Sequence, residues 1–158
     1  MNLGEHIADG CTRRKLTLAT AESCTGGGLS HVLTAIPGAS AFFIGGVIAY
    51  QNEVKIQWLG VPREIIQNQG AVSSPTARAM AEGCRDRFNS DFAVSITGIA
   101  GPGGGSEEKP VGTVHIAVAA QERTRSMAYR FSGDRETVRD SAIAAALELL
   151  LEAMNDQT

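Results

Sequence analysis

The chain has 158 residues and a formal net charge of −3, with 43% hydrophobic and 20% charged residues. This length and composition are typical of one soluble globular domain with one core. The negative charge argues against duplex nucleic acid as the main partner, because that partner requires a basic face. No apolar run approaches the ~20 residues of a membrane-spanning helix, and the first residues do not resemble a signal peptide. We therefore expect neither a nucleic acid nor a membrane as a partner.

Cysteine usage indicates the compartment. Cys11, Cys24 and Cys84 are an odd number of cysteines and lack the spacing of metal ligands. This pattern disfavours both a disulfide framework and a zinc site. We expect a cytoplasmic protein without a metal site.

The first part of the chain alternates between strand and helix patterns. Apolar spacing, short apolar runs and Gly or Pro breaks define the limits of each element. We predict a helix over residues 3–14, a buried strand over 16–21, a helix over 27–34, a strand over 42–50 and a helix over 52–59.

A further helix begins at Ser73-Ser74-Pro75, with Ser74 as its cap and Pro75 in its first turn. The remaining elements follow from apolar runs and turn residues: a buried strand over 91–97, a Gly/Pro-rich loop over 98–110, a hairpin of strands 112–120 and 125–131, and a helix over 134–154. Strands that alternate with helices predict an α/β fold. We expect residues 1–158 to form a single-domain three-layer α/β/α sandwich with a mixed sheet.

A hydroxyl residue stands at the first predicted strand-to-helix turn. Ser23 lies in the segment ESCTGGG, residues 22–28. Such a turn exposes the side chain at the C-terminal edge of the sheet, and the free backbone N–H groups of the next helix turn form an oxyanion hole. The glycines allow a substrate to approach the backbone. Ser23 is therefore a candidate nucleophile, although a helix cap is the commoner role of such a residue.

A serine nucleophile needs a base. His6, His31 and His115 are candidates, but each is more often a surface or core histidine. The chain has three lysines and eleven arginines. Of these two residue types, only lysine can lose its proton in a protein and act as a base. Lys55 follows the strand predicted over 42–50, and partial burial would lower its pKa toward neutrality. The alternative is a solvated surface lysine.

Two further segments could bind a ligand. TGIAGPGGG, residues 97–105, follows a buried strand, and its backbone N–H groups could hold an anion or a carboxamide oxygen. A mobile loop is the alternative. Arg135 and Arg139 are four residues apart in the first turns of the last helix, which suits a phosphate. The alternative is that these two arginines form ion pairs with acidic neighbours.

Together these segments resemble the C-terminal domain of the competence-damage protein CinA, which also occurs alone as nicotinamide-nucleotide amidase. The matching motifs span about residues 18–142 in the family's order: AESCTGGGLS, YQNEVKIQWLGVP, GAVSSPTARAMA, SITGIAGPGGG, KPVGTVHIAV and SGDRETVRDSA. One position departs from the family pattern, because Gln51 stands where a small residue such as Ser is expected.

The resemblance implies hydrolysis of the carboxamide of nicotinamide mononucleotide to nicotinic acid mononucleotide and ammonia, with no cofactor. It implies that Ser23 is the nucleophile and Lys55 the base, with Tyr50 placed to orient either one. The expected oxyanion and substrate-binding residues are Cys24, Thr25, Gly26, Gly27, Thr97, Gly98 and Gly101. Arg135 and Arg139 are the expected phosphate ligands.

Two other functions stay open from the residues. A catalytically silent nucleotide-binding regulatory module would keep the Gly-rich loop and the arginines without needing Ser23. Cys24 could instead be the nucleophile, since adjacent side chains in a turn diverge and at most one faces the substrate. We also expect a homo-oligomer, because small α/β amidases often bury a helical face against a symmetry mate.

Overall fold

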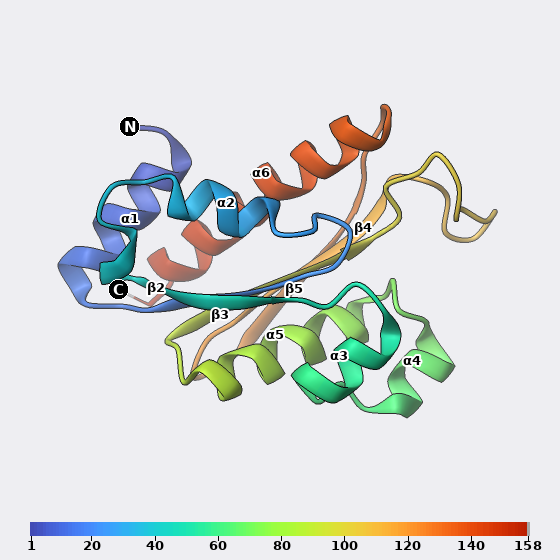
Figure 1. Ribbon diagram of the computed structural model, residues 1–158, viewed down its shortest axis with the longest axis horizontal. Helices are drawn as coiled ribbons and strands as arrows, with labels where there is room; N and C mark the ends of the chain where they lie inside the picture. Colours follow the sequence, from blue (N-terminus) through green and yellow to red (C-terminus); the bar gives the residue numbers. More distant parts are fainter. Residues whose placement is uncertain (158) are drawn as a thin grey trace.

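A five-stranded sheet lies between two layers of helices in the computed structural model, which describes residues 1–157 (Figure 1). The strands are β1 (Leu18–Glu22), β2 (Phe43–Ile48), β3 (Phe92–Gly98), β4 (Thr113–Ala119) and β5 (Thr124–Arg130). The helices are α1 (Leu3–Arg14), α2 (Gly28–Thr34), α3 (Asn52–Leu59), α4 (Arg63–Gln69), α5 (Ser74–Phe88) and α6 (Arg135–Asn155), with a short 3-10 helix at Ala39–Ala41.

The sheet is mixed, with the strand order β2-β1-β3-β4-β5. β2, β1 and β3 are parallel to one another, whereas β4 and β5 continue the sheet as an antiparallel pair. Helices α1, α2 and α6 cover one face, and α3, α4 and α5 cover the other (Figure 1). The predicted single-domain three-layer α/β/α sandwich with a mixed sheet is confirmed.

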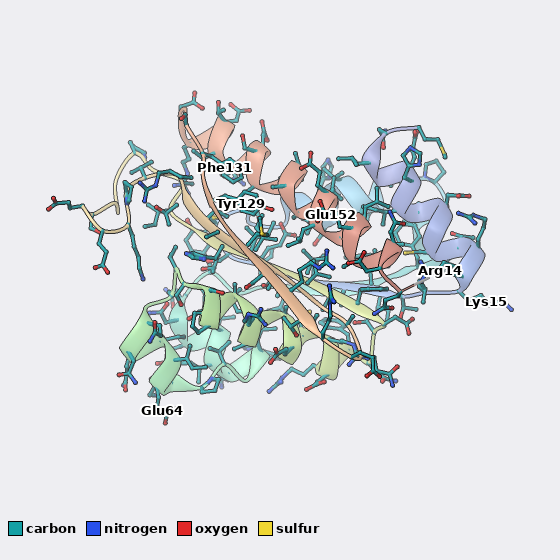
Figure 2. The ribbon with its side chains drawn as sticks, turned by 180° about the vertical axis from the view of Figure 1, so that it is seen from behind. Arg14, Lys15, Glu64, Tyr129, Phe131 and Glu152 are labelled. Carbon is teal, nitrogen blue, oxygen red and sulfur yellow. The ribbon has the colours of Figure 1, made fainter. Side chains whose placement is uncertain are left out.

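Burial explains the composition of the strands. β1 is buried throughout, and β3 is buried except at its last residue, because both lie inside the sheet under helices on either face. The larger apolar cluster fills the space between the sheet and α1, α2 and α6. Tyr129 and Phe131 pack against this cluster on the β5 side, with their rings stacked 5.2 Å apart (Figure 2).

The structure corrects two details of the predicted helices. The side chain of Ser73, and not that of Ser74, caps α5 by accepting a hydrogen bond from the amide of Thr76. Helix α4 was not predicted from the sequence. None of its residues is buried and Pro62 at its start gives no side-chain cap, so the segment has neither the apolar spacing nor the cap that indicates a helix.

The strand directions bring distant segments to one edge of the sheet. The parallel strands β1 and β3 end there side by side, with Glu22 opposite Ile96, and β4 begins there opposite Gly98. The turn after β1, the connection after β2, the Gly-rich loop and the start of α6 therefore converge on this edge. Within residues 1–157, no helix has the length and apolar composition to cross a membrane.

Candidate active site

Ser23 and Lys55 are in direct contact at this edge. Ser23 directly follows β1, and Lys55 lies in α3; its Nζ donates a hydrogen bond to Ser23 Oγ over 3.1 Å. Both side chains are buried, and Lys55 is only 1% exposed. The sequence predicted these two residues as a nucleophile and its base, and the fold brings them within hydrogen-bond distance of each other.

The surroundings of Lys55 favour its neutral form. Its Nζ also donates to the backbone carbonyls of Ala49 (2.8 Å) and Tyr50 (3.1 Å), and none of the ion pairs found within residues 1–157 includes it. Burial lowers the pKa of Lys55 from its ordinary 10.5 to about 8. A neutral amine can keep two N–H groups on the carbonyls and direct its lone pair at the Ser23 hydroxyl. The site is therefore suited to proton transfer from serine to lysine.

A cavity of about 270 Å³ opens beside the two side chains. Most of the predicted site residues line it: Ser23, Cys24, Tyr50, Lys55, Thr97, Gly98, Gly101 and Arg135. Asn52, at the start of α3, also lines it and was not predicted. Asn52 lies between Tyr50 and Lys55 in the motif YQNEVK, and this position could have indicated that it belongs to the site. The Thr97 hydroxyl donates to the Ala71 carbonyl over 2.9 Å, so this side chain holds the cavity wall formed by the segment before α5.

Four other predicted residues do not line this cavity: Thr25, Gly26, Gly27 and Arg139. Gly26 and Gly27 have φ of 58° and 99°, conformations that favour glycine, so they shape the turn that leads into α2. The Arg139 guanidinium donates to the carbonyls of Cys24 and Thr25, each over 3.1 Å. Arg139 thus braces the turn that carries Ser23.

The backbone donors near Ser23 differ from the sequence prediction. The first-turn amides of α2 are not free, because Leu29 and Ser30 donate to the carboxylate of Glu22 over 2.8 and 3.0 Å. The helix turn expected to form the oxyanion hole is thus occupied by a residue of the chain. Within residues 1–157, the amide N–H groups of Cys24 and Thr25 donate to no acceptor on another residue. Of these two residues only Cys24 lines the Ser23 cavity, so its amide is the available oxyanion donor next to Ser23.

Arg135 connects two sides of the cavity mouth. Its guanidinium donates to the carbonyl of Gly101 over 2.7 Å and to the hydroxyl of Tyr50 over 3.0 Å. Gly101 belongs to the Gly-rich loop, and the carbonyl of Tyr50 is one of the groups that hold Lys55. A cation therefore stands at the entrance, on the side where α6 begins.

The alternative catalytic groups are less well placed. His6, His31 and His115 do not line the cavity. His115 lies opposite Thr97 in the neighbouring strand, and burial lowers its pKa. Burial raises the pKa of the Cys24 thiol to about 11, so little thiolate exists at neutral pH. These observations favour serine over cysteine as the nucleophile and lysine over histidine as its base.

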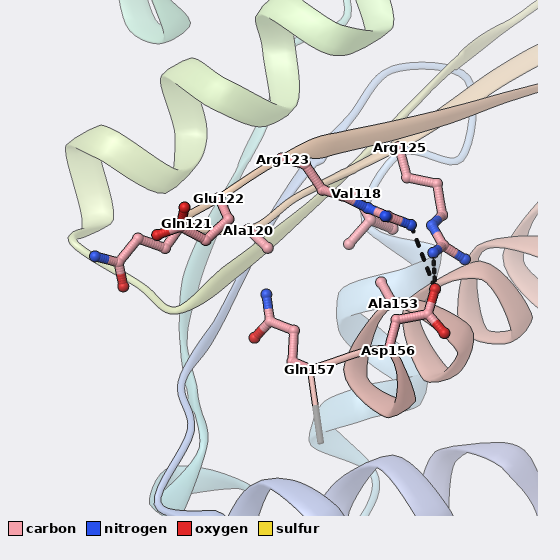
Figure 3. A pocket seen from close by; sticks show the side chains of 9 residues that line it. All are labelled: Val118, Ala120, Gln121, Glu122, Arg123, Arg125, Ala153, Asp156 and Gln157. Atoms are coloured by element: carbon pink, nitrogen blue, oxygen red, sulfur yellow. Dashed lines mark hydrogen bonds and ion pairs between the residues drawn. The ribbon is translucent and has the colours of Figure 1, made fainter.

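A second cavity, of about 390 Å³, lies at the opposite end of the sheet between the β4–β5 hairpin and the end of α6 (Figure 3). Arg123 and Arg125 of the hairpin both pair with Asp156. Among residues 1–157, none of those that line this cavity is a Ser, Thr, Cys, Lys or His. Within residues 1–157, no group of three His, Cys, Asp or Glu side chains could hold a metal ion. The Ser23 cavity is the candidate active site because it brings a serine hydroxyl into contact with a buried lysine amine.

Comparison with known sequences identifies the family. The model of the CinA C-terminal domain matches residues 1–154. A CinA-like protein of Gemmatimonas aurantiaca is 55% identical over 143 residues, which cover 90% of this chain and 33% of that protein. A CinA-like protein of Parasynechococcus marenigrum is 53% identical over 137 residues, 85% of this chain and 32% of that protein. The chain thus spans about a third of the length of these relatives.

Solved structures share the whole fold. The crystal structure of the competence/damage inducible protein CihA from Agrobacterium tumefaciens has a TM-score of 0.94 and 43% identity, covering 97% of this chain and 93% of that one. A CinA superfamily protein from Escherichia coli has a TM-score of 0.93 and 34% identity, covering 96% of this chain and 88% of that one. The chain therefore belongs to the CinA C-terminal domain family.

Proposed function

We propose that this protein is a serine amidohydrolase that converts nicotinamide mononucleotide to nicotinic acid mononucleotide and ammonia. The observation that carries the proposal is the contact between Ser23 Oγ and a buried lysine amine whose pKa is lowered to about 8. Serine is a weak nucleophile until a neighbouring base takes its proton, and Lys55 is such a base. The choice of substrate rests on the family resemblance and on the cation at the cavity mouth.

The reaction begins with attack of Ser23 Oγ on the carboxamide carbon while its proton passes to neutral Lys55. The negative charge that develops on the amide oxygen is stabilised by the backbone amide of Cys24, which lines the cavity. Such a donor is often worth roughly 3–4 kcal/mol in the transition state. This step gives a tetrahedral intermediate bound to Ser23 and a protonated Lys55.

The second step releases ammonia. The C–N bond breaks as the Lys55 ammonium delivers its proton to the departing nitrogen, which leaves an acyl-enzyme on Ser23 and a neutral Lys55. Lys55 then takes a proton from water, and the resulting hydroxide attacks the ester. Breakdown of this second intermediate returns the proton to Ser23 and frees the carboxylate product. No metal or organic cofactor takes part in this sequence.

Arg135 is the proposed contact for the phosphate. Its guanidinium is exposed at the cavity mouth, where it could exchange the Gly101 carbonyl or the Tyr50 hydroxyl for phosphate oxygens. Arg139 does not line the cavity, and its Nε and Nη2 groups donate to the carbonyls of Cys24 and Thr25. The proposal therefore assigns the phosphate first to Arg135, with the carboxamide near Ser23.

The test is ammonia release from nicotinamide mononucleotide by the purified protein and its Ser23→Ala variant. We expect release by the wild type, loss of release by Ser23→Ala, and unchanged release by the matched control Ser40→Ala, whose residue is exposed on the 3-10 helix. Binding of the mononucleotide by the wild type without ammonia release would contradict the proposal and support a catalytically silent module.

A further inference from the structure

A buried carboxylate lies next to the candidate nucleophile. Glu22 is the last residue of β1 and is 1% exposed, and none of the ion pairs found within residues 1–157 includes it. Burying a charge is costly unless hydrogen bonds replace the water that it loses. The groups that provide those hydrogen bonds show what the carboxylate does in the fold.

Both oxygens of Glu22 accept two hydrogen bonds. Oε1 accepts from the Thr25 hydroxyl (2.7 Å) and the Leu29 amide (2.8 Å), and Oε2 accepts from the amide (3.0 Å) and the hydroxyl (2.6 Å) of Ser30. The Ser30 hydroxyl also shares a hydrogen bond of 2.7 Å with Thr20 Oγ1 in β1. The carboxylate therefore joins the end of β1 to both the following turn and the start of α2.

This arrangement replaces the cap that α2 lacks. The cap residue of α2 is Gly27, which has no side chain to accept the first amides of the helix. Instead, the Glu22 carboxylate at the end of β1 accepts hydrogen bonds from the Leu29 and Ser30 amides. The Arg139 guanidinium donates to the carbonyls of the turn before the helix. The turn is thus fixed at the Thr25 hydroxyl and at two carbonyls, and within residues 1–157 the amide of Cys24 is left with no acceptor on another residue.

We propose that Glu22 is a positioning residue for the nucleophile: it fixes the turn of residues 23–27 so that Ser23 Oγ stays against Lys55 and the Cys24 amide stays available for the oxyanion. This inference rests on the proposed serine chemistry. A Gln side chain at this position has nearly the same shape, but an NH₂ group replaces one of the two carboxylate oxygens. This NH₂ group cannot accept the hydrogen bonds that the oxygen accepted. The turn would then shift, and displacements of this kind cost about 10- to 100-fold in rate.

The experiment compares Glu22→Gln with Asn2→Ala. Asn2 caps α1 in a capping box, so its variant also loses a helix cap, but in a helix whose residues do not line the Ser23 cavity. Two rates are measured for each: kcat for ammonia release, and covalent labelling of Ser23 by a fluorophosphonate probe, which reports the nucleophile without the substrate. Circular dichroism gives the folded fraction by which each rate is divided.

We expect Glu22→Gln to lose about 10- to 100-fold in both rates, with an unchanged KM and an unchanged apparent pKa of Lys55 in the rate profile. Asn2→Ala should unfold at a lower temperature with both rates unchanged. If Glu22→Gln does not fold, Thr25→Val and Ser30→Ala each remove one hydroxyl donor and should lower both rates more mildly. Equal labelling of the wild type and of these variants would overturn the inference. A wild type that is neither labelled nor active would instead contradict the proposed function.

Discussion

Lys55 Nζ lies 3.1 Å from Ser23 Oγ, although the two residues are 32 positions apart in the chain. The contact depends on β1 and β2 being parallel neighbours, so that the turn after one strand meets the helix after the other. The backbone carbonyls of Ala49 and Tyr50, just after β2, then fix the amine against the serine. The pH dependence of the proposed reaction follows from this arrangement.

The rate should increase with pH. Only the neutral amine of Lys55 can accept the Ser23 proton, and below its pKa of about 8 the neutral fraction falls about tenfold per pH unit. We therefore expect kcat/KM to rise from pH 6.5 to about 8 and then to level off. A profile that is flat or falls over this interval would contradict Lys55 as the base.

Replacement of Arg135 should weaken binding of the substrate phosphate and leave the rate of the chemical step unchanged. In Arg135→Gln, we expect KM for nicotinamide mononucleotide to rise about 10- to 100-fold, the cost of one hydrogen bond to a charged group. The kcat should stay near that of the wild type. Nicotinamide riboside, which lacks the phosphate, is the control substrate: its kcat/KM should be equal in both proteins. An equal loss for both substrates would show that Arg135 acts on the site in another way.

Thiol reagents should not inactivate the protein. Burial raises the pKa of Cys24 to about 11 and that of Cys11 and Cys84 to about 12, so reactive thiolate is scarce at neutral pH. We expect ammonia release to persist after incubation with iodoacetamide at pH 7.5, with mass spectrometry showing no adduct. Inactivation in step with modification of Cys24 would reopen cysteine catalysis.

One glycine of β2 should be essential for packing. A Cβ atom at Gly46 would lie 2.1 Å from Thr20 Oγ1 and 2.8 Å from the Thr20 carbonyl oxygen. Gly46→Ala should therefore lower the free energy of unfolding by about 1–3 kcal/mol, as overpacking commonly does. Gly103→Ala is the matched control, because a Cβ there meets nothing within 4 Å. Equal thermal unfolding temperatures for the two variants would contradict this packing.

The arrangement of the fold was predictable from the sequence because its signals are local. The buried strands are short apolar runs, α1 begins at the capping residue Asn2, and α3 ends at Gly60, so α1 and α3 were predicted with their observed limits. Helix α4 was missed because no residue in it is buried. The cap of α5 was misassigned by one residue, since Ser73 and Ser74 carry the same hydroxyl and only the backbone conformation separates them.

The site was predictable only in part. Residue type and position indicated Ser23 and the scarcity of lysines drew attention to Lys55, but the distance between them depends on how β1 and β2 pair. The occupation of the α2 amides by Glu22 was missed, because a glutamate at the end of a strand has no sequence signal for capping a helix seven residues later. Arg139 was predicted from the same spacing as Arg135, yet its guanidinium contacts the backbone carbonyls of the Ser23 turn.

The most direct test of the serine–lysine pair is ammonia release by Lys55→Arg at pH 8.5, compared with the wild type and with Lys15→Arg. An arginine keeps the positive charge and cannot serve as a base, whereas Lys15 lies at the end of α1 outside the Ser23 cavity. We predict that Lys55→Arg folds and loses about 10²- to 10⁴-fold in kcat, the contribution of a general base, while Lys15→Arg retains its rate. Near-full activity of Lys55→Arg would contradict the assignment of Lys55 as the base that activates Ser23.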